Sequence, residues 1–336
     1  MMKFSWAIAL VSVALAQEPT IRTNVPLVVV STSVTDSKGH PVGGLSPSDF
    51  AVLDNGKPRR IHVDVSDSEA PPLALVVAIQ ASGFSDPAIK KIRKTASMIS
   101  QSVLGANGEA AVLAFDDKVK VIQGFTRDQD RIADAIDGFK PTSSDDARMI
   151  DAIEKSIELL GARDGARRAC ILLISESRDR GSKLKLPEVL SKLQRSGATI
   201  YAATYSAYLT AFTTKASDYT PDIGEGFPGP GAQNSVSLPP VILELAHAMS
   251  RNTAEAFTSA TGGRRLSFET VSKLETDLSA IADDVHSRYL LSFTPDPTPE
   301  PSFHRLEIRI KNRPDATVRA RPGYWTDVTP GSGNLP

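Results

Sequence analysis

The sequence has one cysteine and almost no net charge. Cys170 is the only cysteine, so no disulfide can form within the chain. It lies in the apolar run ACILLIS, which favours a buried thiol. Lys plus Arg total 38 against 39 for Asp plus Glu. This balance excludes a general field that would attract nucleic acid or an acidic membrane surface, so we expect no nucleic-acid partner.

Long hydrophobic runs are also missing, except at the start. Lys3 precedes an apolar stretch over residues 4–13, and Ala14-Leu15-Ala16 follows. A membrane-spanning helix needs roughly 20 apolar residues, so this pattern is typical of a cleaved export signal rather than a permanent anchor. We predict that residues 1–16 are removed and that the mature chain begins at Gln17. The predicted location is secreted or periplasmic, with no transmembrane segment.

What the sequence contains describes a globular protein. Its length of 336 residues is enough for two domains with a sizeable core. The composition, 41% hydrophobic and 23% charged, is that of a globular protein. Residues 17–68 are rich in β-branched residues and turn signals, which favours a small β unit. Within it, Asn55-Gly56 is a strong hairpin signal, because this turn needs positive φ. So few strands do not fold well by themselves.

Residues 69–266 change to an α/β pattern. Continuous apolar runs, such as residues 73–80, are typical of strands buried on both faces. Apolar residues at helical spacing alternate with these strands. The predicted helices span residues 87–104, 128–139, 145–161, 186–196 and 241–261. Alternation of strands and helices predicts a doubly wound, mostly parallel sheet.

After this core the chain returns to strands. Residues 267–328 contain an amphipathic helix and then alternating segments such as HRLEIRIKN. Pairing these strands with the N-terminal ones would make one small β-sandwich, with the α/β domain inserted between its halves. We group the helix with the C-terminal strands and expect residues 329–336 to be a disordered tail.

A Pro- and Gly-rich segment over residues 207–240 interrupts the α/β rhythm. It follows a predicted core strand, so it should rise at the carboxyl edge of the sheet, where open α/β sheets bind ligands. A second reading, equally weighted, is that it only covers the edge or is disordered. Its aromatic residues are candidate anchors for a partner, as aromatics often are at interfaces. They are Tyr208, Phe212, Tyr219 and Phe227, together with Tyr205 just before them.

The order of elements, with LVVAIQASGFS on the first core strand, resembles the von Willebrand factor type A domain. The flanking motifs are more specific. VSTSVTDSKGHPVGGLSPSDFAVLDNGKPRRI precedes the core, and TGGRRL, YLLSFTPDPTPEPSFHRLEIRIKN and VRARPGYW follow it. They resemble exported proteins with this domain that are abundant in Acidobacteria. Together the resemblances cover nearly all of the mature chain.

The resemblance implies a divalent-metal site at the carboxyl edge of the sheet, where carboxylate and hydroxyl oxygens hold Mg²⁺. The implied ligand positions have lost most of the matching residue types, and only Ser82 keeps its type. They are Gln80, Ser82, Phe84, Ala147 and Ser175. We therefore predict no metal and no cofactor. The alternative is a rearranged site that uses Asp145, Asp146 and Glu176, or the nearby Asp86 and Asp116.

The sequence offers little support for an enzyme. Ser82 lies on a strand-to-helix turn, but Gln80 and Phe84 stand where a nucleophile elbow needs glycines. The five histidines form no H-E-x-x-H, and we find no paired cysteines and no phosphate loop. They are His40, His62, His247, His286 and His304. A hydrolase using Ser82 is the least favoured function.

We therefore predict an exported, non-enzymatic protein-binding or adhesion module with a degenerate metal site. Its candidate ligand surface combines Ser82, Phe84, Asp145, Asp146 and Glu176 with the aromatic residues of segment 207–240. A metal-dependent ligand-binding site and a structural accessory role in the cell envelope stay open as alternatives.

Overall fold

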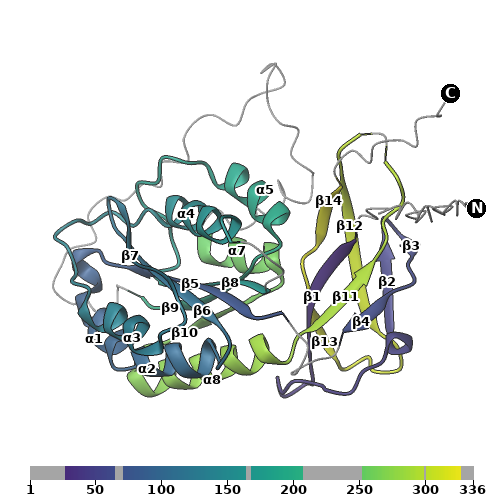
Figure 1. The fold of residues 1–336 in the computed structure, drawn as a ribbon, viewed down its shortest axis with the longest axis horizontal. Coiled ribbons are helices and arrows are strands. Elements are labelled where there is room, and N and C mark those ends of the chain that lie inside the picture. Colours follow the sequence, from purple (N-terminus) through teal and green to yellow (C-terminus); the bar gives the residue numbers. More distant parts are fainter. Residues whose placement is uncertain (1–26, 65–70, 164–167, 207–251, 299, 327–336) are drawn as a thin grey trace, which may run out of the picture.

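A six-stranded, mostly parallel sheet forms the centre of the protein (Figure 1). The structure is a computed structural model that describes residues 27–64, 71–163, 168–206, 252–298 and 300–326. In spatial order the strands are β10 (Arg264–Ser267), β9 (Thr199–Thr204), β8 (Arg168–Ser175), β5 (Leu73–Gln80), β6 (Glu109–Phe115) and β7 (Val119–Thr126). Only β7 is antiparallel to its neighbour. Every residue of β5 is buried, as its continuous apolar run predicts.

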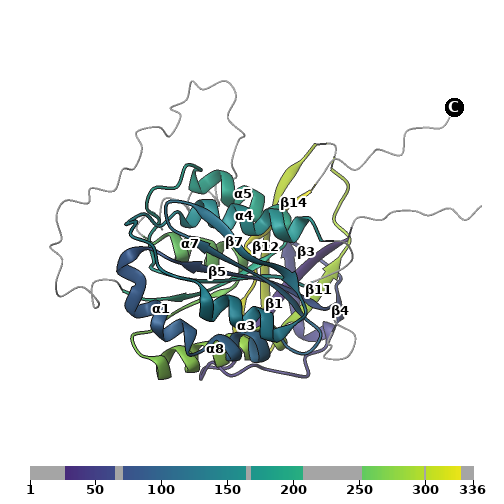
Figure 2. The same cartoon turned by 60° about the vertical axis from the view of Figure 1, so that its left-hand side comes forward.

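Helices cover both faces of this sheet (Figure 1, Figure 2). One face carries α1 (Asp86–Arg93), α2 (Ala96–Met98), a π-helical turn (Ile99–Val103), α3 (Gln129–Gly138) and α8 (Val271–His286). The other carries α4 (Met149–Gly161), α5 (Leu186–Ser196) and α7 (Thr253–Thr261). The fold is therefore the doubly wound α/β architecture that the alternating pattern predicts.

Two antiparallel four-stranded sheets form the β-sandwich beside it. One contains β13 (Thr317–Arg319), β1 (Val28–Thr35), β11 (Tyr289–Phe293) and β4 (His62–Asp64). The other contains β14 (Gly323–Thr326), β12 (Ser302–Ile310), β2 (Phe50–Asp54) and β3 (Lys57–Pro58). Each sheet mixes strands from before and after the α/β domain, so the predicted joining of the two ends holds. Asn55 and Gly56, both with positive φ, make the expected hairpin between β2 and β3.

Three elements differ from their predictions. The helix expected over residues 87–104 breaks after Arg93, where the Thr95 hydroxyl donates to the Ile92 carbonyl at 2.8 Å. The short strand β10 pairs in parallel with β9, where we had expected only the end of a helix. Helix α8, which we had grouped with the C-terminal strands, packs its apolar side in the core of the α/β sheet. Of the helix expected over 241–261, residues 241–251 lie outside the described part.

A buried polar network joins the α/β domain to the sandwich. Arg288, which follows α8, donates to the Ser31 carbonyl at 3.0 Å and to the Gly262 carbonyl at 2.9 Å. It also contacts the Asp284 carboxylate at 2.9 Å and the Tyr201 hydroxyl at 3.0 Å. Both charged side chains are nearly inaccessible, at 4% exposure for Arg288 and 3% for Asp284. Water cannot replace these contacts at such low exposure, so they hold the two domains in one arrangement.

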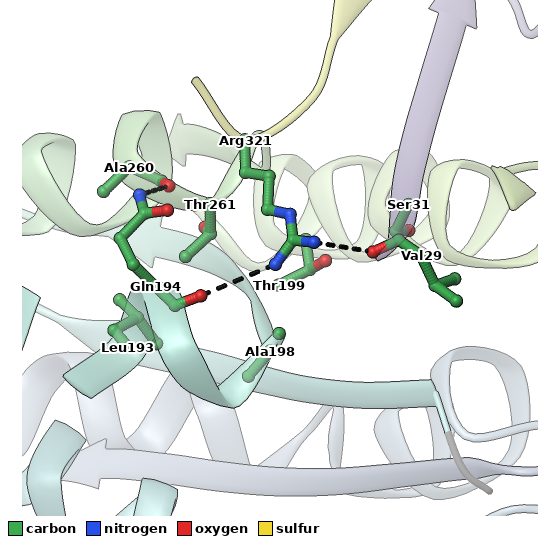
Figure 3. Close-up of a pocket in the computed structure, with 10 residues that line it drawn as sticks. Val29, Ser31, Leu193, Gln194, Ala198, Thr199, Ala260, Thr261 and Arg321 are labelled. Atoms are coloured by element: carbon green, nitrogen blue, oxygen red, sulfur yellow. Dashed lines mark hydrogen bonds between the residues drawn. The ribbon is translucent and has the colours of Figure 1, made fainter. Parts of the chain in front are cut away.

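Arg321 bridges the same junction nearer the surface (Figure 3). It donates to the Val29 carbonyl of β1 at 2.8 Å and to the Gln194 carbonyl of α5 at 3.5 Å. Burial lowers the pKa of Arg321 to about 10. The pocket between these groups has about 10 Å³ of free volume, which is room for roughly one water molecule. It is a gap in the domain interface and too small for a ligand.

Candidate functional site

The carboxyl ends of β5, β6 and β8 meet at one edge of the central sheet. Three loops follow these strands or lie over them: residues 81–85, 142–148 and 176–184. They contact one another directly, because the Gly83 N–H donates to the Ser144 carbonyl at 2.8 Å and the Thr142 N–H donates to the Ala81 carbonyl at 2.8 Å. This is the edge at which the sequence predicted a ligand surface.

Gln80 links the first and third loops through its amide. Its Oε1 accepts the backbone N–H of Glu176 at 2.9 Å, and its Nε2 lies 3.2 Å from the Ser82 hydroxyl. The side chain is fully buried. An aspartate could accept the N–H but could not donate to Ser82, so the amide suits this closed arrangement and a metal-binding carboxylate does not.

The two serines of the edge are turned towards backbone carbonyls. The Ser82 hydroxyl donates to the Asp146 carbonyl, and the Ser175 hydroxyl donates to the Glu176 carbonyl at 2.6 Å. Both residues are fully buried. The side chain of Phe84 lies outside the described part of the structure. The Ser82 hydroxyl therefore joins the first and second loops, whereas the Ser175 hydroxyl bonds locally to the next residue.

Arg180 is a site residue that sequence reasoning missed. Its guanidinium pairs with the Glu176 carboxylate, and its Nε donates to the Asp145 carbonyl at 3.2 Å. Its backbone forms a two-way bridge with Ala147, with both N–H to carbonyl distances at 2.9 Å. A cationic side chain thus joins the second and third loops. Only its position in DRGS, four residues after Glu176, could have suggested this pairing.

The two adjacent acids of the second loop have different roles. Asp145 is exposed and contributes its carbonyl. The Asp146 carboxylate lies 3.5 Å from the Arg148 guanidinium and sits over Gly181. A Cβ at Gly181 would lie 2.9 Å from this carboxyl group, and its φ of +82° is also a glycine conformation. The structure therefore does not gather Asp145, Asp146 and Glu176 around one point.

The third loop is anchored on the N-terminus of α4. The Asp179 carboxylate accepts the Ile150 N–H at 3.0 Å and the Ser182 hydroxyl at 2.6 Å. The Asp151 carboxylate accepts the N–H of Leu184 at 3.0 Å. Burial raises the pKa of Asp179, against the hydrogen bonds that lower it. Negative charge at a helix N-terminus is stabilising, so this loop is fixed in place.

These residues do not fit a Mg²⁺ site. Gln80 and Ser82 have no charge and already bond within the protein, and Ala147 has no side-chain oxygen. The Arg180 cation lies beside the Glu176 carboxylate. Mg²⁺ needs near-octahedral oxygen ligands that compensate for its dehydration. Across the described ranges, no group of three or more His, Cys, Asp or Glu residues could hold a metal.

The sandwich contains a Ser–His–Asp arrangement that the sequence did not reveal. His304 Nδ1 lies 2.7 Å from Asp54 Oδ1, and His304 Nε2 lies 3.2 Å from the Ser302 hydroxyl. This order suits nucleophile activation. However, His304 is buried, and the Ser302 N–H that could stabilise an oxyanion donates to Thr326 at 3.3 Å. Asp54 also accepts the Tyr324 hydroxyl at 3.0 Å, so we interpret the cluster as a structural network.

The predicted aromatic surface is only partly described. Tyr205 is buried, and its hydroxyl donates to the Ser85 hydroxyl at 2.8 Å, so it supports the first loop from inside. Burial raises its pKa. The other four aromatic residues, and also His247, lie outside the described residues. The four are Tyr208, Phe212, Tyr219 and Phe227. Within the described residues, no helix is long and apolar enough to cross a membrane.

The observed class is an open α/β domain with a loop-built carboxyl edge, attached to a β-sandwich. Residues 63–178 match the von Willebrand factor type A domain family. This finding supports such a domain here, and these domains are typically protein-interaction or adhesion modules and generally not enzymes. The finer resemblance to exported proteins of Acidobacteria stays a prediction.

Three solved structures are similar to this chain at low identity. The von Willebrand factor type A protein from Catenulispora acidiphila is 10% identical, with 93% of this chain and 76% of that chain covered and a TM-score of 0.45. BatB from Bacteroides thetaiotaomicron is 12% identical, with 62% of this chain and 98% of that chain covered and a TM-score of 0.41. The von Willebrand factor domain of the type V pilus tip protein Mfa5 from Porphyromonas gingivalis is 14% identical, with 33% of this chain and 40% of that chain covered and a TM-score of 0.30. The comparison with curated proteins gave no match.

Proposed function

We propose that this chain is an exported, non-enzymatic protein-binding module of von Willebrand factor A type, and that its sheet edge works without a metal ion. The observation that supports this most is the internal use of the edge groups. Gln80 and Ser82 bond within the loops, and Arg180 pairs with Glu176. A rigid, loop-built surface of this kind suits recognition of a protein partner.

The metal-free part of the proposal is tested by thermal unfolding of the whole chain. A metal that binds only the folded state at a hundred times its Kd stabilises it by about 2.7 kcal/mol. We expect the same melting temperature in chelator and in millimolar Mg²⁺, Mn²⁺ or Ca²⁺. An upward shift that disappears when Asp145, Asp146 and Glu176 are replaced by Ala, but persists in Asp137→Ala, would instead establish the rearranged metal site.

The binding part is tested by photo-crosslinking from the edge. Asp145 is exposed on the second loop, and Arg313 is exposed on the sandwich. Each is replaced in turn by p-benzoylphenylalanine, and the protein is irradiated with an envelope extract in the presence of chelator. We expect a discrete crosslinked partner from position 145 and none from position 313. Equal labelling at both positions, or loss of the crosslink in chelator, would refute the proposal.

A further inference from the structure

A groove of about 810 Å³ lies beside the carboxyl edge, between the β6–β7 hairpin and the end of α3. Its apolar lining includes Ala114, Ile122 and Phe139. Its charged lining includes three exposed lysines, Lys118, Lys120 and Lys140. This volume lies within the usual range for ligand sites, about 300–1,000 Å³.

The groove runs along β7, which is the outermost strand of the central sheet. Within the described residues, no strand pairs with its outer side. The Asp116 N–H donates to the Lys118 carbonyl at 3.0 Å and closes the hairpin, and Ala114 is opposite Lys120. Bonded pairs alternate along an antiparallel ladder, so the N–H and carbonyl groups of Val119 and Val121 point away from β6. They can pair with an added strand.

The two faces of β7 differ in a regular way. Lys120 and Ile122 line the groove. Val119 packs against the opposite core, and Val121 on that face is 37% exposed. Side chains of neighbouring strands meet on the same face, and opposite charges or apolar pairs stabilise such contacts. An added strand would therefore need acidic residues on the groove face and apolar residues on the other.

The charges of the groove point to the same ligand. The three lysines make no ion pair with a described residue. Burial would raise the pKa of Asp116, but hydrogen bonds from Thr142 and the Lys118 N–H keep it below its ordinary value, so this acid is satisfied inside the protein. Three acids, Asp116, Asp117 and Asp134, balance the three lysines in formal charge. Selection of the ligand therefore depends on position, because Lys120 on β7 and Lys118 just before it are exposed where the side chains of an added strand would meet them.

We propose that this groove binds an extended segment of a partner protein, with alternating acidic and apolar residues, which adds to the sheet as a strand along β7. The inference rests on the proposed binding function and names the chemistry of its ligand. Main-chain hydrogen bonds to Val119 and Val121 supply general affinity, and Lys118 and Lys120 select the acidic face. Ile122 and Phe139 contact the aliphatic part of the glutamate side chains.

The test uses a fluorescein-labelled peptide, acetylated at its start, with four Val-Glu repeats, and measures its anisotropy with the whole chain. Two matched peptides serve as controls. One has Lys in place of Glu, and the other keeps Val-Glu but carries N-methyl groups on alternate residues, which removes the strand-pairing donors. We expect the Val-Glu peptide to bind about tenfold more tightly than either control, equivalent to about 1.4 kcal/mol.

Variants of the protein locate the site. Lys120→Glu should weaken Val-Glu binding by about tenfold and favour the Val-Lys peptide, because the cross-strand charge pair is inverted. Lys38→Glu makes the same charge change on an exposed loop of the sandwich and should have no effect. The proposal is overturned if the Val-Glu and Val-Lys peptides bind alike, if N-methylation has no effect, or if Lys120→Glu behaves as Lys38→Glu does.

These outcomes are separable from those of the proposed function. A crosslinked partner at position 145 together with failure of the Val-Glu peptide would refute only the groove. Peptide binding at β7 without any crosslink at position 145 would keep the groove and refute the loop edge as a partner surface.

Discussion

The domain junction gives the sharpest test of how this structure is held together. Arg288 is 4% exposed and contacts the carboxylate of Asp284 and two carbonyl groups, those of Ser31 and Gly262. Arg288→Met keeps much of the side-chain volume but removes every one of these donors. It leaves the Asp284 carboxylate buried with Arg319, at 2.9 Å, as its remaining cation.

Removal of one partner from a buried ion pair costs about 3–5 kcal/mol, because the other charge stays in a poorly solvated place. We expect Arg288→Met to lower the free energy of unfolding by about 3 kcal/mol, near the lower end of this range, since Arg319 still compensates part of the Asp284 charge. Neutralising both members should be milder. We therefore expect Arg288→Met combined with Asp284→Asn to recover at least about 1 kcal/mol relative to Arg288→Met alone.

The pH dependence of the free energy of unfolding gives an independent test of this ion pair. Burial would raise the pKa of Asp284, but Arg288 and the hydroxyls of Ser33 and Tyr201 lower it below its ordinary value of 3.8. A lowered carboxyl pKa contributes stability above the unfolded pKa, and this stability is lost as pH falls through the folded pKa. Without Arg288 the carboxylate loses the neighbour that lowers its pKa most, so the pKa of Asp284 should be higher in the variant than in the wild type. The difference between the wild type and Arg288→Met should therefore shrink below about pH 3.8.

Urea unfolding measures both effects. Trp325 on β14 stacks under Arg195 of α5, with 4.4 Å from the guanidinium carbon to the ring centroid, so its fluorescence reports on the junction. Circular dichroism at the helix band reports on the α/β domain. We expect coincident transitions in the wild type and separate ones in Arg288→Met. A change below about 1 kcal/mol with coincident transitions would refute the argument, because surface pairs alone reach that size.

Three further predictions concern other parts of the chain. Gly263→Ala should strongly destabilise the fold, because its Cβ would lie 1.8 Å from the Ile200 carbonyl oxygen, whereas Gly124→Ala meets nothing within 4 Å and should be tolerated in the same melting assay. Cys170 should resist a thiol reagent until the protein unfolds, since burial raises its pKa to about 12, and fast labelling of the native protein would contradict this. N-terminal sequencing of the exported protein should begin at Gln17, and retention of Met1 would count against the export signal.

The sequence was informative where one local signal decides the structure. The buried run of β5 and the Asn55-Gly56 turn each have a single physical solution. The break after Arg93 carries neither Gly nor Pro, so periodicity predicted a continuous helix. The strand β10 is only four residues long, and its pairing depends on β9 lying beside it. The helix α8 is amphipathic in sequence, but only the assembled core shows which sheet its apolar side contacts.

The candidate site was the hardest part to predict, because it too depends on contacts between residues far apart in the sequence. The resemblance indicated which metal ligands were lost, but periodicity does not show what replaces them. Arg180 and Asp179 lie in a loop, and their partners on the second loop and α4 are about 30 residues away. A Glu176–Arg180 pair on a partly exposed edge contributes only about 0–1 kcal/mol.

The geometry of the edge must therefore come chiefly from the hydrogen bonds of the buried Gln80 amide and the half-buried Asp179 carboxylate. A buried polar group left without its partner costs about 1–3 kcal/mol. In the proposed metal-free edge this difference has a functional consequence. A chelator can remove an exchangeable ion that organises such an edge, whereas an edge organised by hydrogen bonds of amide and carboxylate side chains keeps its shape. Its recognition should then respond to ionic strength, through the exposed lysines along β7, rather than to the supply of divalent cations.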